Sequence, residues 1–391
     1  MRTCCKFLAG SCLAIFSCFA PSAAAEEGWE IKPSFRGQVD YTWADASRSD
    51  FTVDSAELRQ FRAGITAKKS GAEWKAELVT DDDGNVAVTD VYFKKALAAP
   101  GWSVRLGHFK TANSLDEQTS EWVSGDFERA AFTDAFEFER RLGVQLERIG
   151  DVHSFYAGVF ASNVNDEAFS EGHAIAGRYV FTPKRPEGEV LHIGLSARWR
   201  EAGGSLPDFR YRQRPFTHNA GRVVATPRLG GKDLFAGAEF AWLKGPAWIA
   251  AEAAILSDDM TGGGNATFTG GYLEAGYMLG GRRTYKGHKF DRPKIDRPVT
   301  EGGPGALLTA VRYDTLDLED GDVNGGKLDT LILALDWYLT SRIHAGINFF
   351  RSEPEFGSVD GGIDPAFAAA WLAGETGDTI TGATFRIQFE Y

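Results

Sequence analysis

The stretch from Gly101 to Gly150 places the tightest constraint on the fold of this chain. Its flanks read WSVRLG at 102–107 and RLGVQL at 141–146, so apolar residues alternate with polar residues or glycine. This alternation predicts strands with one apolar and one polar face. The residues between them show no clean period, and so long a connection is uncommon in a compact soluble domain. A transmembrane β-barrel can carry such a loop inside its lumen.

Fourteen further segments alternate in the same way, which gives sixteen in all. Each is close to the length that a tilted transmembrane strand requires. The segments centre on residues 31–43, 57–68, 72–81, 86–96, 101–110, 138–149, 152–162, 173–182, 191–201, 232–244, 247–258, 268–280, 305–317, 327–340, 343–354 and 379–391. An even number of strands allows both ends of the barrel sheet to lie on one side of the membrane.

The connections between these segments differ in length on the two sides of the predicted barrel. With the first strand starting in the periplasm, the tight turns at Ser70-Gly71, Gly150-Asp151 and Gly245-Pro246 fall on the periplasmic side. The long connections 111–137, 202–231 and 355–377 fall outside. This asymmetry is typical of bacterial outer-membrane barrels, whereas a soluble β-sandwich favours similar loops at both ends.

The first 25 residues have the composition of a secretory signal peptide. Arg2 and Lys6 precede an apolar run and the small residues of Ala23-Ala24-Ala25, so cleavage is expected after Ala25. The outer-membrane domain then spans 26–391. All four cysteines lie in the leader, which leaves the mature chain without disulfides or cysteine ligands for a metal. A lipoprotein site at Cys12 or Cys18 is the alternative.

The charge of the mature chain argues against a nucleic-acid partner. Removing the leader takes away two of 42 basic residues and none of 54 acidic residues, so the net charge becomes −14. Phosphate backbones require clustered positive charge instead. The last segment, TITGATFRIQFEY, ends in an alternating apolar ladder with a terminal aromatic residue, as outer-membrane strands do. We therefore predict the cell outer membrane as location and its lipid as a partner.

Residues 281–304 form a long connection on the side where the other turns are short. They contain seven basic residues against three acidic ones. Two interpretations remain open: a solvated charged loop, or an electropositive exit that attracts anions.

Several stretches resemble one known family, the phosphate-selective porins O and P. The similar stretches are AELRQFRAGITAKKSGAEWKAEL, VRLGHFK with ERRLGVQL, FRYRQRPFTHNAGRV, GYLEAGYMLGGRRTYKGHKFDRPK, AVRYDTLDLEDGDVNGGKLDTLILALDWYL and the closing strand. The resemblance implies an all-β transmembrane antiparallel barrel of sixteen strands that assembles as a homotrimer. It also implies that the third outer loop folds inward as a constriction and that basic residues line an anion path.

Alternation assigns many charged residues to the inner face of this barrel. The basic ones are Lys32, Arg36, Arg62, Lys75, Lys94, Arg105, Arg141, Arg178, Arg198, Arg200, Arg312 and Arg386, and the acidic ones are Asp40, Glu73, Glu77, Asp90, Glu147, Glu252, Asp314, Asp336 and Glu390. The guanidinium group of arginine binds oxyanions in bidentate fashion, and rings of Arg or Lys in a pore favour the passage of anions. The alternative is that these residues pair with carboxylates and merely hydrate and stiffen the wall.

We expect anion binding at the strands and the long loop near the constriction. The candidate residues are Arg62, Lys75, Arg105, Lys110, Arg129, Arg140 and Arg141. The loop also carries an excess of acidic residues, which weakens a strict preference for phosphate and fits a general porin as well. The leading hypothesis is passive diffusion of small hydrophilic anions, phosphate or polyphosphate among them. A weakly selective porin and a structural or surface-interaction barrel are the alternatives.

Enzymatic and metal-binding patterns are weak. The histidines are isolated in sequence, and no serine lies in a G-x-S-x-G elbow, so we predict neither catalysis nor a cofactor. Residues 320–324 start like a calcium loop, but Leu331 replaces the glutamate that would complete it. A tight outer turn is the preferred interpretation, with weak divalent binding left open.

Overall fold

The computed structural model describes residues 28–80, 84–165, 172–203, 209–358 and 361–391. The predicted leader lies outside these ranges, so its boundary stays a prediction. Sixteen antiparallel strands form one closed barrel, which confirms the predicted fold class and strand number. The barrel strands, in order around the wall, are β1 (Glu30–Ala46), β2 (Thr52–Lys69), β3 (Ala72–Thr80), β4 (Val86–Ala96), β5 (Trp102–Lys110), β6 (Arg140–Arg148), β7 (His153–Phe160), β8 (His173–Phe181), β9 (Glu189–Glu201), β12 (Gly230–Lys244), β13 (Ala247–Met260), β14 (Asn265–Leu279), β17 (Ala306–Asp320), β18 (Val323–Tyr338), β19 (Ile343–Glu355) and β20 (Ile380–Glu390).

Closure is made by the first and last barrel strands. β1 pairs with β20 from Arg36 opposite Glu390 to Ala46 opposite Ile380. All other neighbours in the wall are adjacent in chain order once the two small extra sheets are set aside. The barrel is therefore an up-and-down sheet without an open edge.

The wall has its apolar side outward. On β20 the side chains of Phe385, Ile387 and Phe389 are 43%, 50% and 47% exposed, while Arg386 and Gln388 between them are 2% and 3% exposed. A water-soluble sheet would bury its aromatic residues and expose the arginine. This inversion suits strands whose outer face lies in hydrocarbon and whose inner face is polar. Within the described part of the chain, no helix is both long and apolar enough to cross a bilayer.

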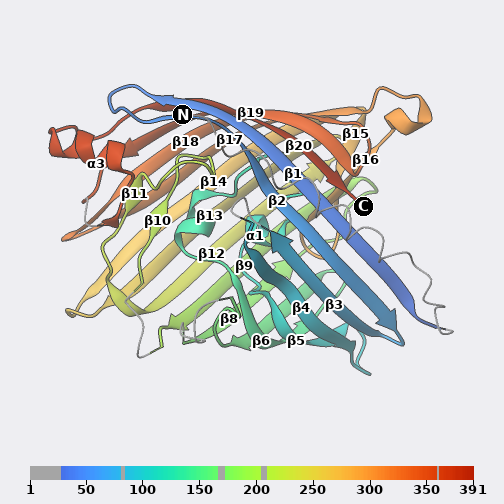
Figure 1. Ribbon diagram of the computed structural model, residues 1–391. Coiled ribbons are helices and arrows are strands. Elements are labelled where there is room, and N and C mark those ends of the chain that lie inside the picture. Colours follow the sequence, from blue (N-terminus) through green and yellow to red (C-terminus); the bar gives the residue numbers. More distant parts are fainter. Residues whose placement is uncertain (1–27, 81–83, 166–171, 204–208, 359–360) are drawn as a thin grey trace.

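The two ends of the barrel differ as the sequence predicts. The long-loop end carries the connections 111–139, 202–229 and 356–379, with helices α1 (Leu115–Gln118), α2 (Ala131–Ala135) and α3 (Pro365–Leu372) and the small sheet of β10 (Arg212–Gln213) and β11 (Val224–Ala225). At the short-turn end several connections are two to five residues long. Figure 1 shows α3, β10 and β11 at one end of the barrel and β15 and β16 at the other.

The long connection at the short-turn end, 280–305, is more ordered than a solvated loop. It forms a hairpin of β15 (Gly281–Tyr285) and β16 (Phe290–Ile295), followed by a short 3-10 helix at Val299–Glu301. Arg283 of this hairpin is buried and its guanidinium lies 2.8 Å from Glu274 of β14. The solvated interpretation therefore fits the exposed Arg282, Lys286 and Lys294 but not Arg283.

Some strands extend further than their hydrophobic alternation indicates. β17 and β18 continue to a two-residue turn at Gly321-Asp322, whereas the sequence pattern ends at 317 and resumes at 327. The added residues include the charged Glu319 and Asp320, and Lys327 of β18 forms ion pairs with Asp317 and Glu319 of β17. Backbone pairing between the two strands thus continues beyond the residues whose apolar alternation defined the predicted strand ends. The 320–324 segment is accordingly a hairpin turn.

Candidate functional site

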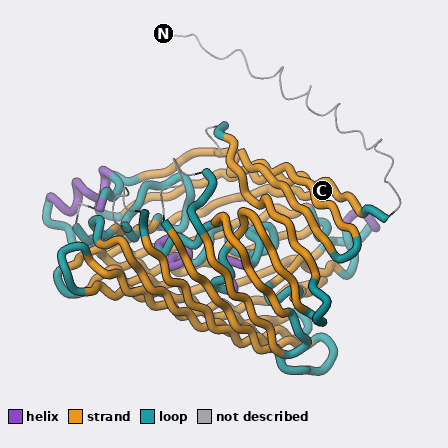
Figure 2. Tube along the Cα trace, turned by 90° about the horizontal axis from the view of Figure 1, so that it is seen from below, coloured by secondary structure: helices purple, strands orange, loops and turns teal. Residues whose placement is uncertain are grey.

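Loop 111–139, between β5 and β6, contacts strands far apart around the wall. Glu252 of β13 accepts hydrogen bonds from the backbone N–H groups of Leu115 (2.9 Å) and Asp116 (2.6 Å) at the start of α1. Asn348 of β19 accepts one from the N–H of Phe127 (2.8 Å). In Figures 1 and 2 the helical turns of this loop lie within the outline of the barrel.

Arginines of the wall complete the attachment of this loop. Arg386 of β20 donates to the carbonyl of Phe127, and Arg198 of β9 donates to that of Phe136 at 2.8 Å. Arg312 of β17 binds the Asp116 carboxylate at 2.8 Å. These partners come from β9, β13, β17, β19 and β20, so the loop is bonded to five strands on one side of the wall.

A small basic pocket lies on the other side, against β1–β6. It has a volume of about 220 Å³ and is lined by eight basic and three acidic side chains. The basic ones, which we call the basic cluster, are Arg36, Arg62, Lys75, Arg105, Lys110, Arg129, Arg140 and Lys289. Tyr92 and Phe109 also line the pocket, and the Arg105 guanidinium carbon lies 4.8 Å from the centre of the Tyr92 ring.

Most of the basic cluster is paired with carboxylates. Arg36, Arg62, Lys75, Arg105, Lys110, Arg129 and Arg140 share six carboxylates, those of Glu77, Asp90, Glu117, Glu121, Glu147 and Glu390. Lys289, from the turn of the β15–β16 hairpin, has no carboxylate within 4.0 Å among the described residues. The cluster therefore keeps an excess of positive charge although its members are held by ion pairs.

Two groups outside the membrane-spanning strands show how strong this field is. Burial alone would raise the pKa of Glu121, but Arg62, Arg129 and Arg59 hold that pKa well below its usual range. Burial and the charges of Arg105 and Lys75 lower the pKa of Lys289 to about 8. The shift of Glu121 runs against burial and therefore reports the positive charge, whereas for Lys289 burial is the larger cause and the positive charge adds to it.

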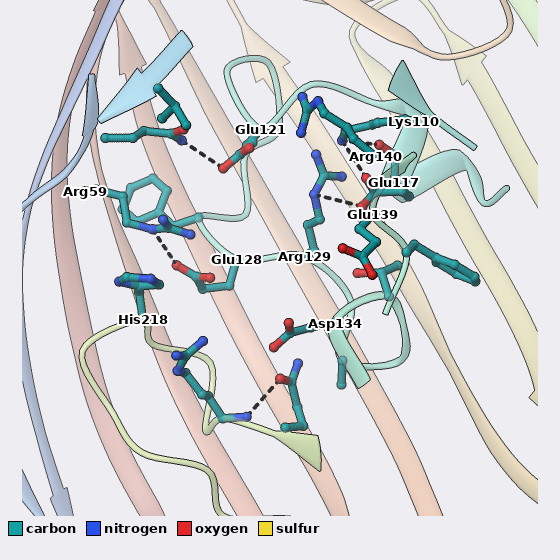
Figure 3. Close-up of a pocket in the computed structure, with 18 of the residues that line it drawn as sticks. Arg59, Lys110, Glu117, Glu121, Glu128, Arg129, Asp134, Glu139, Arg140 and His218 are labelled. Carbon is teal, nitrogen blue, oxygen red and sulfur yellow. Dashed lines mark hydrogen bonds and ion pairs between the residues drawn. The ribbon is translucent and has the colours of Figure 1, made fainter. Parts of the chain in front are cut away.

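A larger pocket of about 440 Å³ adjoins the basic pocket, and five residues line both: Arg62, Lys110, Glu121, Arg129 and Arg140. Figure 3 shows this pocket between loop 111–139, the strand carrying Arg59, and the segment carrying His218. Its ionisable lining is balanced, with six basic and six acidic residues besides His218. Glu128, Asp134 and Glu139 stand on the loop, and Glu128 pairs with Arg59 at 3.5 Å.

Segment 209–229 adds a row of arginines beside the large pocket. Phe209, Tyr211 and Gln213 are buried, whereas Arg210, Arg212 and Arg214 alternate with them and remain partly exposed. Burial and neighbouring arginines, Arg222 among them, lower the pKa of Arg214 and Arg212. Like charges are thus held close together near the long-loop end.

Six of the seven predicted site residues meet at the basic pocket. Arg62, Lys75, Arg105, Lys110, Arg129 and Arg140 all line it, whereas Arg141 lines neither pocket. Arg141 is buried in β6, where it donates to the Ala161 carbonyl and lies 3.5 Å from Glu139. The anion-binding role of all seven stays a prediction. Lys32, also assigned to the lumen, is an exposed residue near the start of β1 and pairs with Glu30.

Several inward arginines form ion pairs deep in the wall instead. Arg178 of β8 binds Glu239 of β12 at 2.5 Å, Arg200 binds Asp233 at 2.6 Å, and Arg386 binds Asp40 at 2.6 Å. These side chains are almost completely buried. For them, the interpretation that pairing stiffens the wall applies.

Sequence reasoning missed Arg59 and Lys289. Strict alternation along β2 would place Arg59 and Arg62 on opposite faces of the wall. A register shift in the β1–β2 ladder between Gln38 and Asp40 changes which side chains of β2 face inward, and so allows both to do so. Lys289 belongs to the connection that had a solvated interpretation. Its placement depends on how the hairpin packs, which no local pattern encodes. In the described residues no cluster of three or more His, Cys, Asp or Glu side chains suited to a metal occurs.

Comparison with known proteins places these features in a family. Residues 31–354 match the model of the phosphate-selective porins O and P. A protein of Caulobacter vibrioides without an assigned function is 35% identical over 364 residues, which cover 84% of this chain and 72% of that protein. Porin O of Pseudomonas aeruginosa is 26% identical over 381 residues, or 85% of either chain.

Solved structures agree on the architecture. An anion-selective porin from Comamonas acidovorans superposes with a TM-score of 0.58 at 12% identity, over 93% of this chain and all of that one. OmpT of Vibrio cholerae gives a TM-score of 0.59 at 9% identity, over 94% of this chain and 99% of that one. At such low identity these likenesses concern the fold alone. With the family match over most of its length and the closed sixteen-strand barrel, this chain is an outer-membrane porin and belongs to the phosphate-selective porin O and P family.

Proposed function

We propose that this porin passes small hydrophilic anions, phosphate among them, by passive diffusion through the large pocket and then the basic pocket. The observation that carries the proposal is the basic cluster, in which eight basic side chains face three acidic ones around about 220 Å³. An anion entering there exchanges part of its hydration for Arg and Lys donors. No covalent step is required.

Loop 111–139 forms the constriction in this proposal. Its bonds to β9, β13, β17, β19 and β20 support an inward fold, and its residues Glu121 and Arg129 line both pockets. The transported ion would pass between this loop and strands β1–β6. Since the cations are paired, they bind an anion weakly enough for it to leave, as conduction requires.

A homotrimer is the proposed assembly. One of the similar solved structures is a trimer form of Vibrio cholerae OmpT, with a TM-score of 0.54 at 11% identity, which supports this expectation by analogy of fold. Each protomer would contain its own pore, because the barrel closes within one chain.

The test is the reversal potential of the purified protein in planar bilayers under a salt gradient. We expect preference for chloride over potassium, conductance steps in groups of three, and reduction of the chloride current by phosphate. Cation preference would refute the anion path. A reversal potential near zero would instead favour a weakly selective general porin, which the balanced charge of the large pocket supports. Absence of conductance would favour a structural or surface-interaction barrel.

A further inference from the structure

The tip of the β15–β16 hairpin, residues 285–290, is docked in a polar socket on the barrel wall. The ring of His288 lies with Nε2 3.0 Å from Ser154 Oγ and Nδ1 2.9 Å from the Tyr156 hydroxyl, both on β7. The His288 carbonyl accepts a hydrogen bond from Arg178 of β8 at 3.1 Å. One residue of the hairpin thus bonds to two neighbouring strands.

A second contact fixes the same tip. The Tyr285 hydroxyl lies 2.6 Å from Nδ1 of His192 on β9, and Nε2 of His192 lies 3.0 Å from Glu239 on β12. Glu239 also binds Arg178. The socket therefore consists of side chains from four adjacent strands, joined by one hydrogen-bonded network.

The tip adopts a backbone conformation that depends on this docking. His288 has a φ of +63°, in the left-handed region that disfavours residues with a side chain. The preceding residue, Gly287, has a φ of +61°, which glycine adopts without steric cost. A histidine at such a position is retained at a conformational cost, which the contacts of its ring and carbonyl offset.

Docking decides where Lys289 lies. Lys289 follows His288 directly and lines the basic pocket beside Lys75 and Arg105. The base of the hairpin is held separately, through Arg283 to Glu274 and Arg292 to Glu390. Release of the tip would therefore move Lys289 and open this end of the pore without detaching the hairpin.

We propose that His288 is a positioning residue of the pore: in its neutral form it docks the hairpin tip and holds Lys289 in the basic pocket, and when protonated it releases the tip. This inference rests on the proposed anion path. It identifies a device at the short-turn end that is distinct from loop 111–139.

The charges around His288 determine the direction of the response. Arg178 and His192 face it from the wall, and both oppose a second positive charge, while Glu239 is already bound to both of them. The other ionisable neighbours are Tyr156, Tyr285 and Lys289. Burial, Arg178 and His192 lower the pKa of His288 to about 4. The docked state is fully favoured at pH values above the ordinary histidine pKa, which applies to the released tip. As the pH falls from there toward 4, the equilibrium constant for docking decreases by up to about tenfold per pH unit.

The experiment compares the wild-type porin with His288→Gln and His288→Ala in planar bilayers from pH 7 to pH 4. Compared with His288→Gln at the same pH, acid should increase the single-channel conductance of the wild type and lower its anion-to-cation permeability ratio by about two- to fivefold, because one cation leaves the path. His288→Gln keeps a donor and an acceptor but does not titrate, so this part of the response should disappear. His288→Ala should show the acid behaviour already at pH 7. His173→Gln, an exposed histidine at the start of β8, is the control.

Acid also protonates the pore carboxylates, which raises anion preference in every variant, so the difference between wild type and His288→Gln carries the result. An unchanged acid response in His288→Gln would overturn the inference, as would wild-type behaviour of a correctly folded His288→Ala at pH 7. A second measurement does not need conduction. In the mature chain, which contains no cysteine, Lys289→Cys should react with a bulky maleimide faster when His288→Ala is added. Equal rates would refute docking by His288, whereas absence of current with unequal rates would refute only the proposed anion path.

Discussion

The large pocket and the basic pocket share five residues, yet they present different electrostatic environments to a solute. The large pocket has six basic and six acidic side chains, and several of its carboxylates stand on loop 111–139. The basic pocket has eight basic and three acidic ones and receives most of them from the barrel strands. Carboxylates of the loop thus balance the positive charge of the large pocket, whereas side chains of the barrel strands give the basic pocket its net positive charge. The difference indicates that selectivity resides in the smaller space.

Neutralising residues that line only the basic pocket should have the largest effect. We expect Lys75→Gln, Arg105→Gln and Lys289→Gln combined to reduce the chloride-to-potassium permeability ratio about tenfold or more, because three charges close to the path are lost. Reversal potentials measure this directly. Lys68→Gln, an exposed residue at the end of β2, is a matched control. A triple variant with wild-type selectivity would place the filter elsewhere.

Removing carboxylates that line only the large pocket should have a smaller effect of the opposite sign. Glu128→Gln, Asp134→Asn and Glu139→Gln combined should raise anion preference by about two- to threefold, since this wider space is better hydrated and its charges are screened. The gain should shrink in concentrated salt. An effect as large as that of the basic-pocket variant would contradict the division between the two spaces.

The smallest expected effect is the alkaline response of Lys289. Because its pKa lies near 8, Lys289 is charged at pH 7 and loses its charge as the pH rises toward 9. Anion preference should therefore fall by about twofold over that range. Lys289→Arg stays charged and should flatten the profile. If the arginine variant shows the same fall, another group titrates in the pore.

The sequence predicts the basic pocket better than the large one, for a physical reason. Lys75 and Arg105 lie on regular strands, where a period of two assigns them to the lumen. The pairing of neighbouring strands then brings such residues together. Arg59 departs from this rule through a bulge, and Lys289 through the packing of a hairpin. Both depend on contacts between distant segments, which alternation within one strand does not report.

Arg141 shows that a correct prediction of the inner face does not by itself identify a residue that meets solute. Alternation places it on the inner face, but Arg141 is buried, as are other inward arginines such as Arg178 and Arg312. Whether an inward arginine meets solute or a carboxylate depends on where loop 111–139 and the β15–β16 hairpin lie. Glu239 and Glu274, the partners of Arg178 and Arg283, occupy inward positions of β12 and β14. The alternation of inward and outward residues along β12 and β14 could have identified both glutamates from the sequence.

The seam between β1 and β20 has a consequence for how the protein folds. Asp40 and Arg386, 346 positions apart in the chain, meet across it in a buried ion pair. Contacts of such separation carry a high entropic cost of loop closure and form slowly. Until they form, two strand edges are unpaired and open to another chain. We therefore expect the seam to be the last part of the wall to acquire protection from hydrogen exchange during refolding, and a variant such as Asp40→Asn to delay that step.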